Sequence, residues 1–121
     1  MNVYTDSKGN RVAVYSLGLA RAVSLTGVSA VQSGTALDGL SVRQNAVMTV
    51  TTTAGASAGD VQLQGSLDGT NFVNLGSAVS TTAASTTTAV VVQTAFVRYV
   101  RASITTPITG GQVNVSVGVS G

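Results

Sequence analysis

The sequence predicts an all-β protein, an antiparallel β-sandwich of seven or eight short strands with jelly-roll-like connections. Three observations predict this fold class. Apolar and polar residues alternate along most of the chain, which is the pattern of strands with one buried face. Turn signals rich in Gly, Asn and Asp interrupt the alternation at spacings typical of an antiparallel meander. No segment has the apolar periodicity of an amphipathic helix of three turns.

The alternation is clearest near the C-terminus and in the middle of the chain. Within residues 110–121, valines occupy every second position from 113 to 119 and face away from polar or small residues. Within residues 60–67, Val61, Leu63 and Leu67 form an apolar face opposite glutamine and serine side chains. Strands are therefore predicted over residues 10–17, 27–34, 45–53, 60–67, 86–93, 96–105 and 110–121.

The remaining segments are less regular. Residues 17–27 fit either a strand or a short helix or turn, and residues 80–88 predict an exposed loop or a frayed edge. Pro107 is expected between strands, where its missing N–H breaks no ladder hydrogen bond. We expect residues 1–9 to form a flexible arm and residues 10–121 to form a single domain.

The composition predicts an unusually neutral surface. Charged residues make up 8% of the chain, against about 25% in an average soluble domain, so Thr, Ser, Asn and Gln must supply the polar surface. Such a surface opposes self-association weakly. The net charge of +2 comes from scattered basic residues, which does not indicate a nucleic-acid partner. No stretch resembles a secretory signal or a membrane span, so no membrane partner is expected.

The chemistry of the side chains argues against an enzyme. The chain has no His and no Cys, and its only carboxylates are Asp6, Asp38, Asp60 and Asp68. Ser and Thr are abundant, but no base is present to activate one. We therefore expect no catalytic residues, no metal site and no cofactor. Asp38 and Asp68 each precede a glycine, where an aspartate caps its own turn by accepting hydrogen bonds from backbone amides.

The stretch GSLDGTNFVNLGS, residues 65–77, predicts a well-formed hairpin. Asp68 and Gly69 are its structural turn residues, because Gly69 supplies the positive φ that a tight turn needs. Phe72 and Leu75 would then anchor the returning strand in the core.

Two arginines and a few aromatic residues are the other side chains of interest. Arg98 and Arg101 lie three apart on one predicted strand and should point to opposite faces, with one of them paired to Asp68 or Asp60. Phe96, like Phe72, is assigned to the core. The tyrosines are expected to be half-buried rather than to form a sugar-stacking platform; these are Tyr4, Tyr15 and Tyr99.

Residues 60–119 resemble two groups of proteins through the stretches GSLDGTNFVNLGS, AFVRYVRASIT and GGQVNVSVGVSG. The first group comprises small virion structural proteins of tailed bacteriophages, of the capsid decoration or cement type, which share an S-x-DG-x-N-F/W hairpin, an RYVR strand and a valine-rich last strand. The second is the discoidin (coagulation factor 5/8 type C) module, a jelly roll with a similar hairpin. Discoidin modules usually carry a disulfide and a tryptophan in this hairpin, and this chain has neither.

The phage resemblance implies a virion protein, made in the host cytoplasm, that binds the major capsid protein and stabilises the capsid. It further implies a homo-oligomer, with a trimer preferred because capsids present threefold sites. Candidate interface residues are Tyr4, Lys8, Arg98 and Arg101. Two alternatives stay open: a discoidin-like module that binds a glycan or another surface, and a component of the phage tail or fibre.

Overall fold

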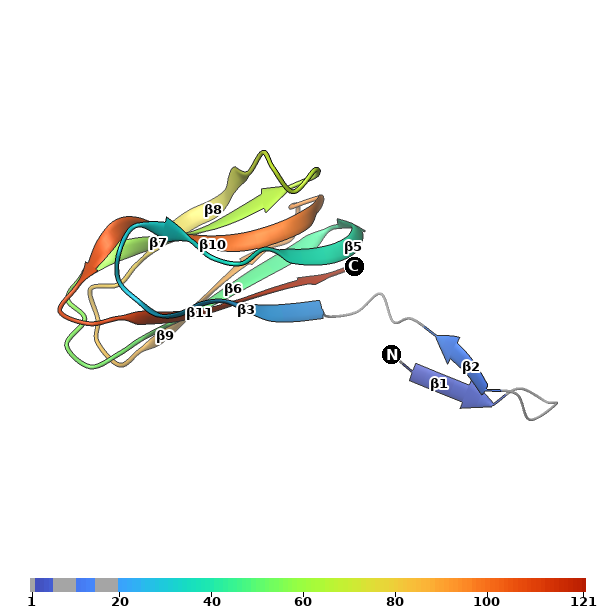
Figure 1. Cartoon of the computed structure of the whole chain (residues 1–121), viewed down its shortest axis with the longest axis horizontal. Helices are drawn as coiled ribbons and strands as arrows, with labels where there is room; N and C mark the ends of the chain where they lie inside the picture. The colour runs from blue at the N-terminus through green and yellow to red at the C-terminus, as the bar shows by residue number, and fades with distance from the viewer. Residues whose placement is uncertain (1, 6–10, 15–19) are drawn as a thin grey trace.

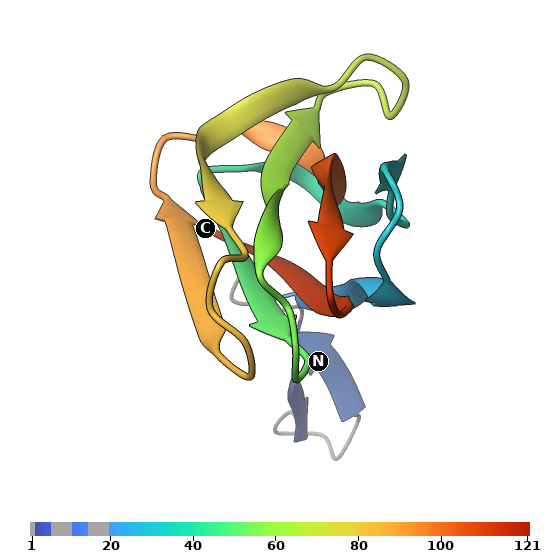
Figure 2. The same cartoon turned by 90° about the vertical axis from the view of Figure 1, so that its left-hand side faces the viewer.

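The computed structural model describes the backbone of residues 2–5 and 11–14 and all atoms of residues 20–121. Two antiparallel sheets, one of five strands and one of four, pack face to face, which confirms the predicted β-sandwich (Figures 1 and 2). The described part of the chain contains strands and no helix. Its strands are β1 (Asn2–Thr5), β2 (Arg11–Val14), β3 (Ala20–Val28), β4 (Gln32–Ser33), β5 (Leu37–Arg43), β6 (Asn45–Thr52), β7 (Ala58–Ser66), β8 (Val73–Ser80), β9 (Thr87–Val92), β10 (Val97–Thr109) and β11 (Val113–Ser120).

The strand pairing is nested along the sequence. β3 pairs with β11, β5 with β10, β6 with β9 and β7 with β8, as if one long antiparallel hairpin had been rolled up. The resulting sheets have the orders β3-β11-β6-β9 and β4-β10-β7-β8, with β5 also paired to β10.

The core lies between the two sheets and is built from the alternating apolar positions. In the four-stranded sheet, Val115 pairs with Val50 and Val117 pairs with Met48, and all four side chains are buried. Val61 and Leu63 of β7 and the apolar residues of β10 face them from the other sheet. Burial of these aliphatic side chains is the main favourable term in the stability of the fold.

The ambiguous segment 17–27 was left open between a strand and a short helix or turn, and its described part belongs to β3. Two local expectations changed in the structure. Residues 37–43, where Asp38-Gly39 indicated only a turn, form β5. Pro107 lies inside β10 and not between strands. It is tolerated there because the register of β10 against β7 shifts between Thr106 and Thr109, so the proline interrupts no regular ladder.

The connection between β8 and β9 is shorter than the predicted loop at residues 80–88: it spans residues 81–86 and is exposed except at Thr81. Thr52 holds it in place: its hydroxyl donates to the carbonyl of Ala83 at 2.7 Å and accepts from the N–H of Thr86 at 3.0 Å. Most of the expected N-terminal arm lies outside the described residues. β1 lies in this arm and pairs antiparallel with β2, which follows the arm in sequence.

Candidate functional site

The loop between β7 and β8 is organised around one carboxylate. Oδ1 of Asp68 accepts hydrogen bonds from the N–H groups of Thr70 and Asn71, each at 2.8 Å, and Oδ2 accepts from the Asn71 side-chain amide at 2.7 Å. The hydroxyl of Ser66 donates to Asp68 Oδ1 at 2.8 Å and accepts from the N–H of Gly69 at 2.9 Å. Gly69 has a φ of +79°, the left-handed value that the sequence pattern required of it. The hairpin tip is therefore a rigid support for its neighbours.

The same hydrogen bonds change the acidity of Asp68. The N–H groups of Asn71 and Thr70, followed by the Asn71 amide and the Ser66 hydroxyl, hold the pKa of this carboxyl well below its ordinary value of 3.8. Asp68 is consequently an anion throughout the physiological range.

This depressed pKa predicts an acid-dependent loss of stability. Above the ordinary value of 3.8 the stabilisation is fully present, and it is lost as the pH falls toward the lower pKa of the folded state. We expect Asp68→Asn to be less stable than wild type near neutrality but to lose less stability on acidification. Urea unfolding at a series of pH values measures both. Identical pH dependence in the two proteins would contradict the role assigned to the carboxylate.

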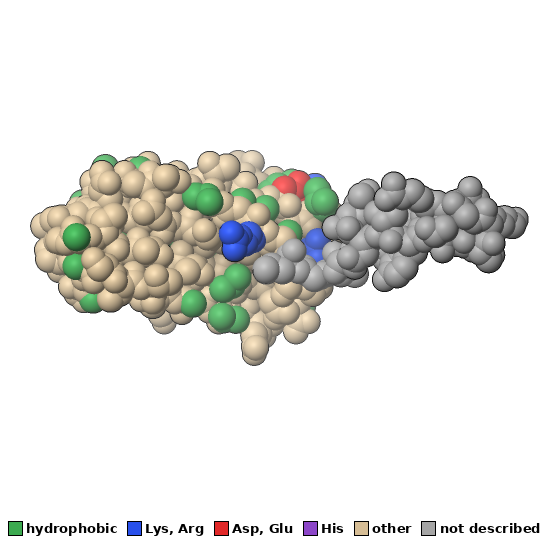
Figure 3. Space-filling model, turned by 90° about the horizontal axis from the view of Figure 1, so that it is seen from below, with side chains coloured by type: hydrophobic (Ala, Val, Ile, Leu, Met, Phe, Trp, Pro, Cys, Tyr) green, Lys and Arg blue, Asp and Glu red, His purple; other side chains and the backbone are tan. Residues whose placement is uncertain are grey.

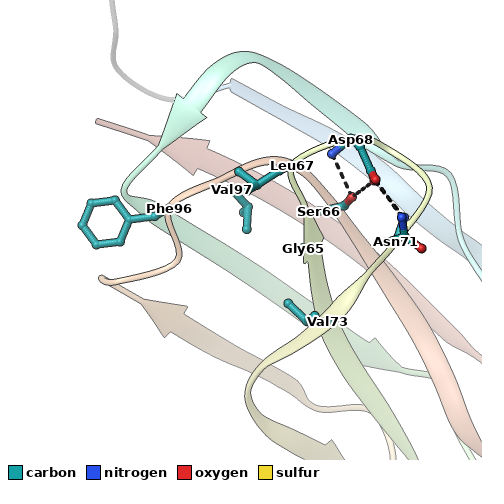
Figure 4. Close-up of a pocket in the computed structure, with 8 residues that line it drawn as sticks. All are labelled: Gly65, Ser66, Leu67, Asp68, Asn71, Val73, Phe96 and Val97. Carbon is teal, nitrogen blue, oxygen red and sulfur yellow. Dashed lines mark hydrogen bonds between the residues drawn. The ribbon is translucent and has the colours of Figure 1, made fainter.

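An apolar hollow of about 320 Å³ lies beside this loop (Figure 4). Its apolar lining includes three large side chains that are more than half exposed: Leu67 (64%), Val73 (60%) and Phe96 (55%). Val97 and Gly65 form the buried part of the lining, and Ser66, Asp68 and Asn71 add a polar side. Exposed apolar side chains gathered around a concave surface are typical of interaction sites.

Phe96 is the least expected member of the hollow. The sequence-based assignment of Phe96 to the core is wrong, because its φ of +49° turns the backbone just before β10 and leaves the ring exposed. A positive φ is rare for an aromatic residue and costs on the order of 1–3 kcal/mol. Backbone strain of this kind is concentrated at functional positions. Leu67 was expected on the core face, but β7 ends at Ser66 and Leu67 lies in the loop.

Arg98 pairs with a different aspartate from those expected. Its Nε and Nη2 donate to the two carboxylate oxygens of Asp38 at 2.8 and 3.0 Å. The reason is the register of β5 on β10, which places Asp38 directly opposite Tyr99, next to Arg98. Both side chains of this pair are partly exposed, so it contributes little to stability.

Arg101 covers the base of the hairpin. Its guanidinium lies 3.9 Å from the centre of the Phe72 ring, and its Nε donates to Gln64 Oε1 at 3.0 Å. Phe72 is thus half-buried beneath an arginine instead of fully inside the core. Val97 and Val100 are both core residues because the register of β10 shifts between Val97 and Tyr99. Strict alternation, on which the opposite orientation of Arg98 and Arg101 was based, therefore fails here.

The remaining candidate residues are not brought to the hollow. Tyr99 is half-buried on β10, and the side chains of Tyr4, Lys8 and Tyr15 lie outside those that the structure describes. Among the described residues there is no group of three His, Cys, Asp or Glu side chains placed to hold a metal ion. No helix within the described ranges is long and apolar enough to cross a membrane.

The fold and the hollow together define a β-sandwich protein with an exposed apolar hollow beside the β7–β8 loop. Residues 40–121 match the family described as a domain of unknown function (DUF6385), and the chain belongs to that family. Its fold is similar to the crystal structure of the SPBc2 prophage-derived protein YomS, with a TM-score of 0.61 and 12% sequence identity. The similarity covers 91% of this chain and 100% of that one. No curated protein is similar enough in sequence to count as a relative.

Proposed function

We propose that this protein is a non-enzymatic structural component of a tailed-bacteriophage particle, and that it decorates and stabilises the capsid. The observation that carries the proposal is the fold shared with a prophage-derived protein over 91% of the chain. The major capsid protein is the proposed partner, and the virion is the proposed location.

The character of the surface supports a protein that functions when packed against others. On the face seen in Figure 3, uncharged groups dominate and charged side chains occupy only a few small areas. Thr and Ser side chains have no charge to desolvate, and an interface can bury them at low cost where their hydroxyls find hydrogen-bond partners. A chain with 8% charged residues suits a particle surface better than a dilute monomeric state.

The hollow is the surface that we assign to capsid contact. An apolar side chain of the capsid protein would fill it and cover Leu67, Val73 and Phe96, each of which would contribute on the order of 1 kcal/mol. The rigid turn around Asp68 would keep the rim of the hollow in place, so little entropy is lost on binding. Because the protein would bind the assembled shell and not free subunits, it would shift the equilibrium toward assembly by mass action.

Particles carrying the protein provide the direct test. Electron cryomicroscopy should show it on the capsid surface, and quantitative mass spectrometry should give many copies per particle. Absence from purified particles would overturn the proposal. A few copies at the tail would favour the tail or fibre alternative, and binding to a defined glycan by the purified protein would favour the discoidin-like alternative.

Substitution in the hollow should separate binding from folding. Phe96→Asp places a charge at the hollow, while aspartate tolerates the positive φ of this position, so the free energy of unfolding should not fall by more than about 0.5 kcal/mol. Occupancy on capsids that lack the protein should fall by roughly tenfold or more. Val31→Asp is the matched control, because Val31 is equally exposed (59%) and does not line the hollow. Equal occupancy of the two variants would contradict the role of the hollow.

A further inference from the structure

The free edges of the two sheets differ in how they are protected. An exposed edge strand presents unpaired N–H and C=O groups that can pair with another chain, and proteins protect edges with charges, bulges, prolines or covering segments. In the described part of the chain, the edge strands are β3 and β9 in one sheet, and β8 and the β4/β5 pair in the other.

The edge at β3 is covered by the chain that follows it. The N–H of Thr35 donates to the carbonyl of Ser24 at 3.0 Å, and the Ser24 hydroxyl donates to the carbonyl of Thr35 at 2.9 Å. Gly34 lies so close to Ser24 that an added Cβ would overlap its backbone. A second chain could not reach the middle of β3 without displacing this segment.

The edges of the five-stranded sheet are irregular. The register of β8 shifts against β7 between Val61 and Leu63, and the buried Gln62 amide donates to the carbonyls of Leu75 and Gly76 at 3.0 and 3.3 Å. A bulge of this kind twists an edge away from further pairing. At the other edge, β4 has two residues and β5 is bent by Leu40, whose φ is +67°.

The strand β9 has none of these protections among the described elements. It pairs with β6 from Thr87 to Val92 without a register shift, and it contains no charged residue and no proline. It lies in an uncharged run that extends from Gly69 to Val97. Figure 2 shows β9 (orange) at the margin of the molecule, and Val91 is 61% exposed.

The inner side of β9 is already occupied, which leaves its edge as the available surface. Gly76 of β8 packs over Val92 and Val90 so closely that an added Cβ would lie 3.0 Å from Val92 Cγ2. Side chains of a docking partner therefore have no room between β8 and β9. Backbone groups along the free edge can still accept a partner strand.

We propose that β9 pairs antiparallel with β9 of a second copy of this chain, so that two four-stranded sheets join into one across a twofold axis. The edge is self-complementary, because an antiparallel pair of identical strands exchanges the same backbone groups in both directions. In an antiparallel pair, directly opposite residues lie on the same face of the sheet. The twofold axis therefore passes between the two copies of one residue that lie opposite each other, such as the two copies of Ala89 or of Val90. The absence of charge means that no like charges are brought together.

This arrangement is a dimer, in contrast to the trimer expected from capsid symmetry. A ring of three joined by edge pairing of the four-stranded sheet would need each β9 to pair with β3 of the next copy, and the β3 edge is covered by residues 34–35. The inference concerns the purified protein alone. It therefore stands or falls independently of whether the protein decorates a capsid.

The test is the oligomeric state of the full chain and of two matched variants by sedimentation equilibrium. Val91→Lys puts a cation on the proposed interface, and Val23→Lys puts one on the opposite edge strand of the same sheet, where Val23 is similarly exposed (57%). Wild type and Val23→Lys should dimerise equally, and Val91→Lys should raise the dissociation constant by roughly tenfold or more. A wild-type monomer at all concentrations, a trimer, or a dimer insensitive to Val91→Lys would overturn the proposal.

Crosslinking gives a second test that does not depend on the lysine variants. The chain has no cysteine, so Ala89→Cys introduces a single thiol at an exposed position close to the proposed axis. Mild oxidation should produce a covalent dimer of this variant, and Val23→Cys should remain monomeric on denaturing gels. Equal crosslinking of the two variants would contradict pairing through β9.

Discussion

Replacing Leu63 with Ala should lower the free energy of unfolding by about 2–5 kcal/mol, because the substitution leaves a cavity in the middle of the core. Leu63 is 0% exposed and lies at the centre of β7, opposite Ala102 of β10 on one side and Leu75 of β8 on the other. β10 is also paired with β4 and β5, so on that side of Leu63 the surrounding side chains have little freedom to fill the space.

The control for this prediction is Leu67→Ala, four residues further along the same segment. Leu67 lies beyond the end of β7 and is largely exposed, so its removal should change stability by less than about 0.5 kcal/mol. Urea unfolding followed by circular dichroism measures both variants. Comparable losses would mean that Leu67 belongs to the core, as strict alternation along residues 60–67 would have placed it.

The contrast between these two leucines illustrates how far alternation predicts this fold. The period of two identified the buried faces of β6, β7 and β11, because a strand paired on both sides and covered by the other sheet must bury every second residue. It could not show where β7 ends. That boundary depends on the hydrogen bonds of Ser66 and Asp68. They begin the loop after Ser66, although the alternating apolar pattern continues to Leu67.

The features that the sequence did not reveal depend on contacts between distant segments. The pairing of Arg98 with Asp38 follows from the register of β5 on β10, a contact between residues 60 positions apart. The exposure of Phe96 follows from one positive φ, which residue type alone does not predict for an aromatic side chain. The hollow was missed because it depends on this exposure, although its polar side, formed by Ser66, Asp68 and Asn71, lies in the stretch that was recognised as a hairpin.

A long uncharged segment of the chain forms a defined part of the folded structure. The uncharged run from Gly69 to Val97 contains β8, β9 and four of the residues that line the hollow, so half of the lining and the open edge of β9 belong to one continuous neutral segment. Arg21, Asp38 and Arg98 belong to the strands β3, β5 and β10. The proposed self-pairing uses only this uncharged segment, and the proposed capsid contact uses it for the apolar residues Val73 and Phe96, beside the hydrogen-bonded carboxylate of Asp68.

Gly110→Ala should be the most damaging substitution in a turn, with an expected loss of at least about 2 kcal/mol. Gly110, between β10 and β11, and Gly55, between β6 and β7, both have positive φ values, of +80° and +90°. The two turns touch: a Cβ added to Gly110 would overlap the carbonyl oxygen of Gly55, and one added to Gly55 would lie 2.5 Å from that of Gly110. The alanine variant therefore combines an unfavourable φ with a collision against backbone that cannot move aside.

Asparagine variants separate these two causes. Asparagine adopts positive φ more readily than other residues with a Cβ, so Gly110→Asn relieves most of the conformational strain but keeps the collision. Gly69 provides the matched control, because its φ of +79° is almost the same while an added Cβ would lie in ordinary contact, 3.4 Å from the Tyr99 ring. We expect Gly110→Asn to destabilise the protein nearly as much as Gly110→Ala, and Gly69→Asn to cost less than about 0.5 kcal/mol. If both asparagine variants unfold at the same denaturant concentration as wild type, the close approach of the two turns is not what requires glycine at position 110.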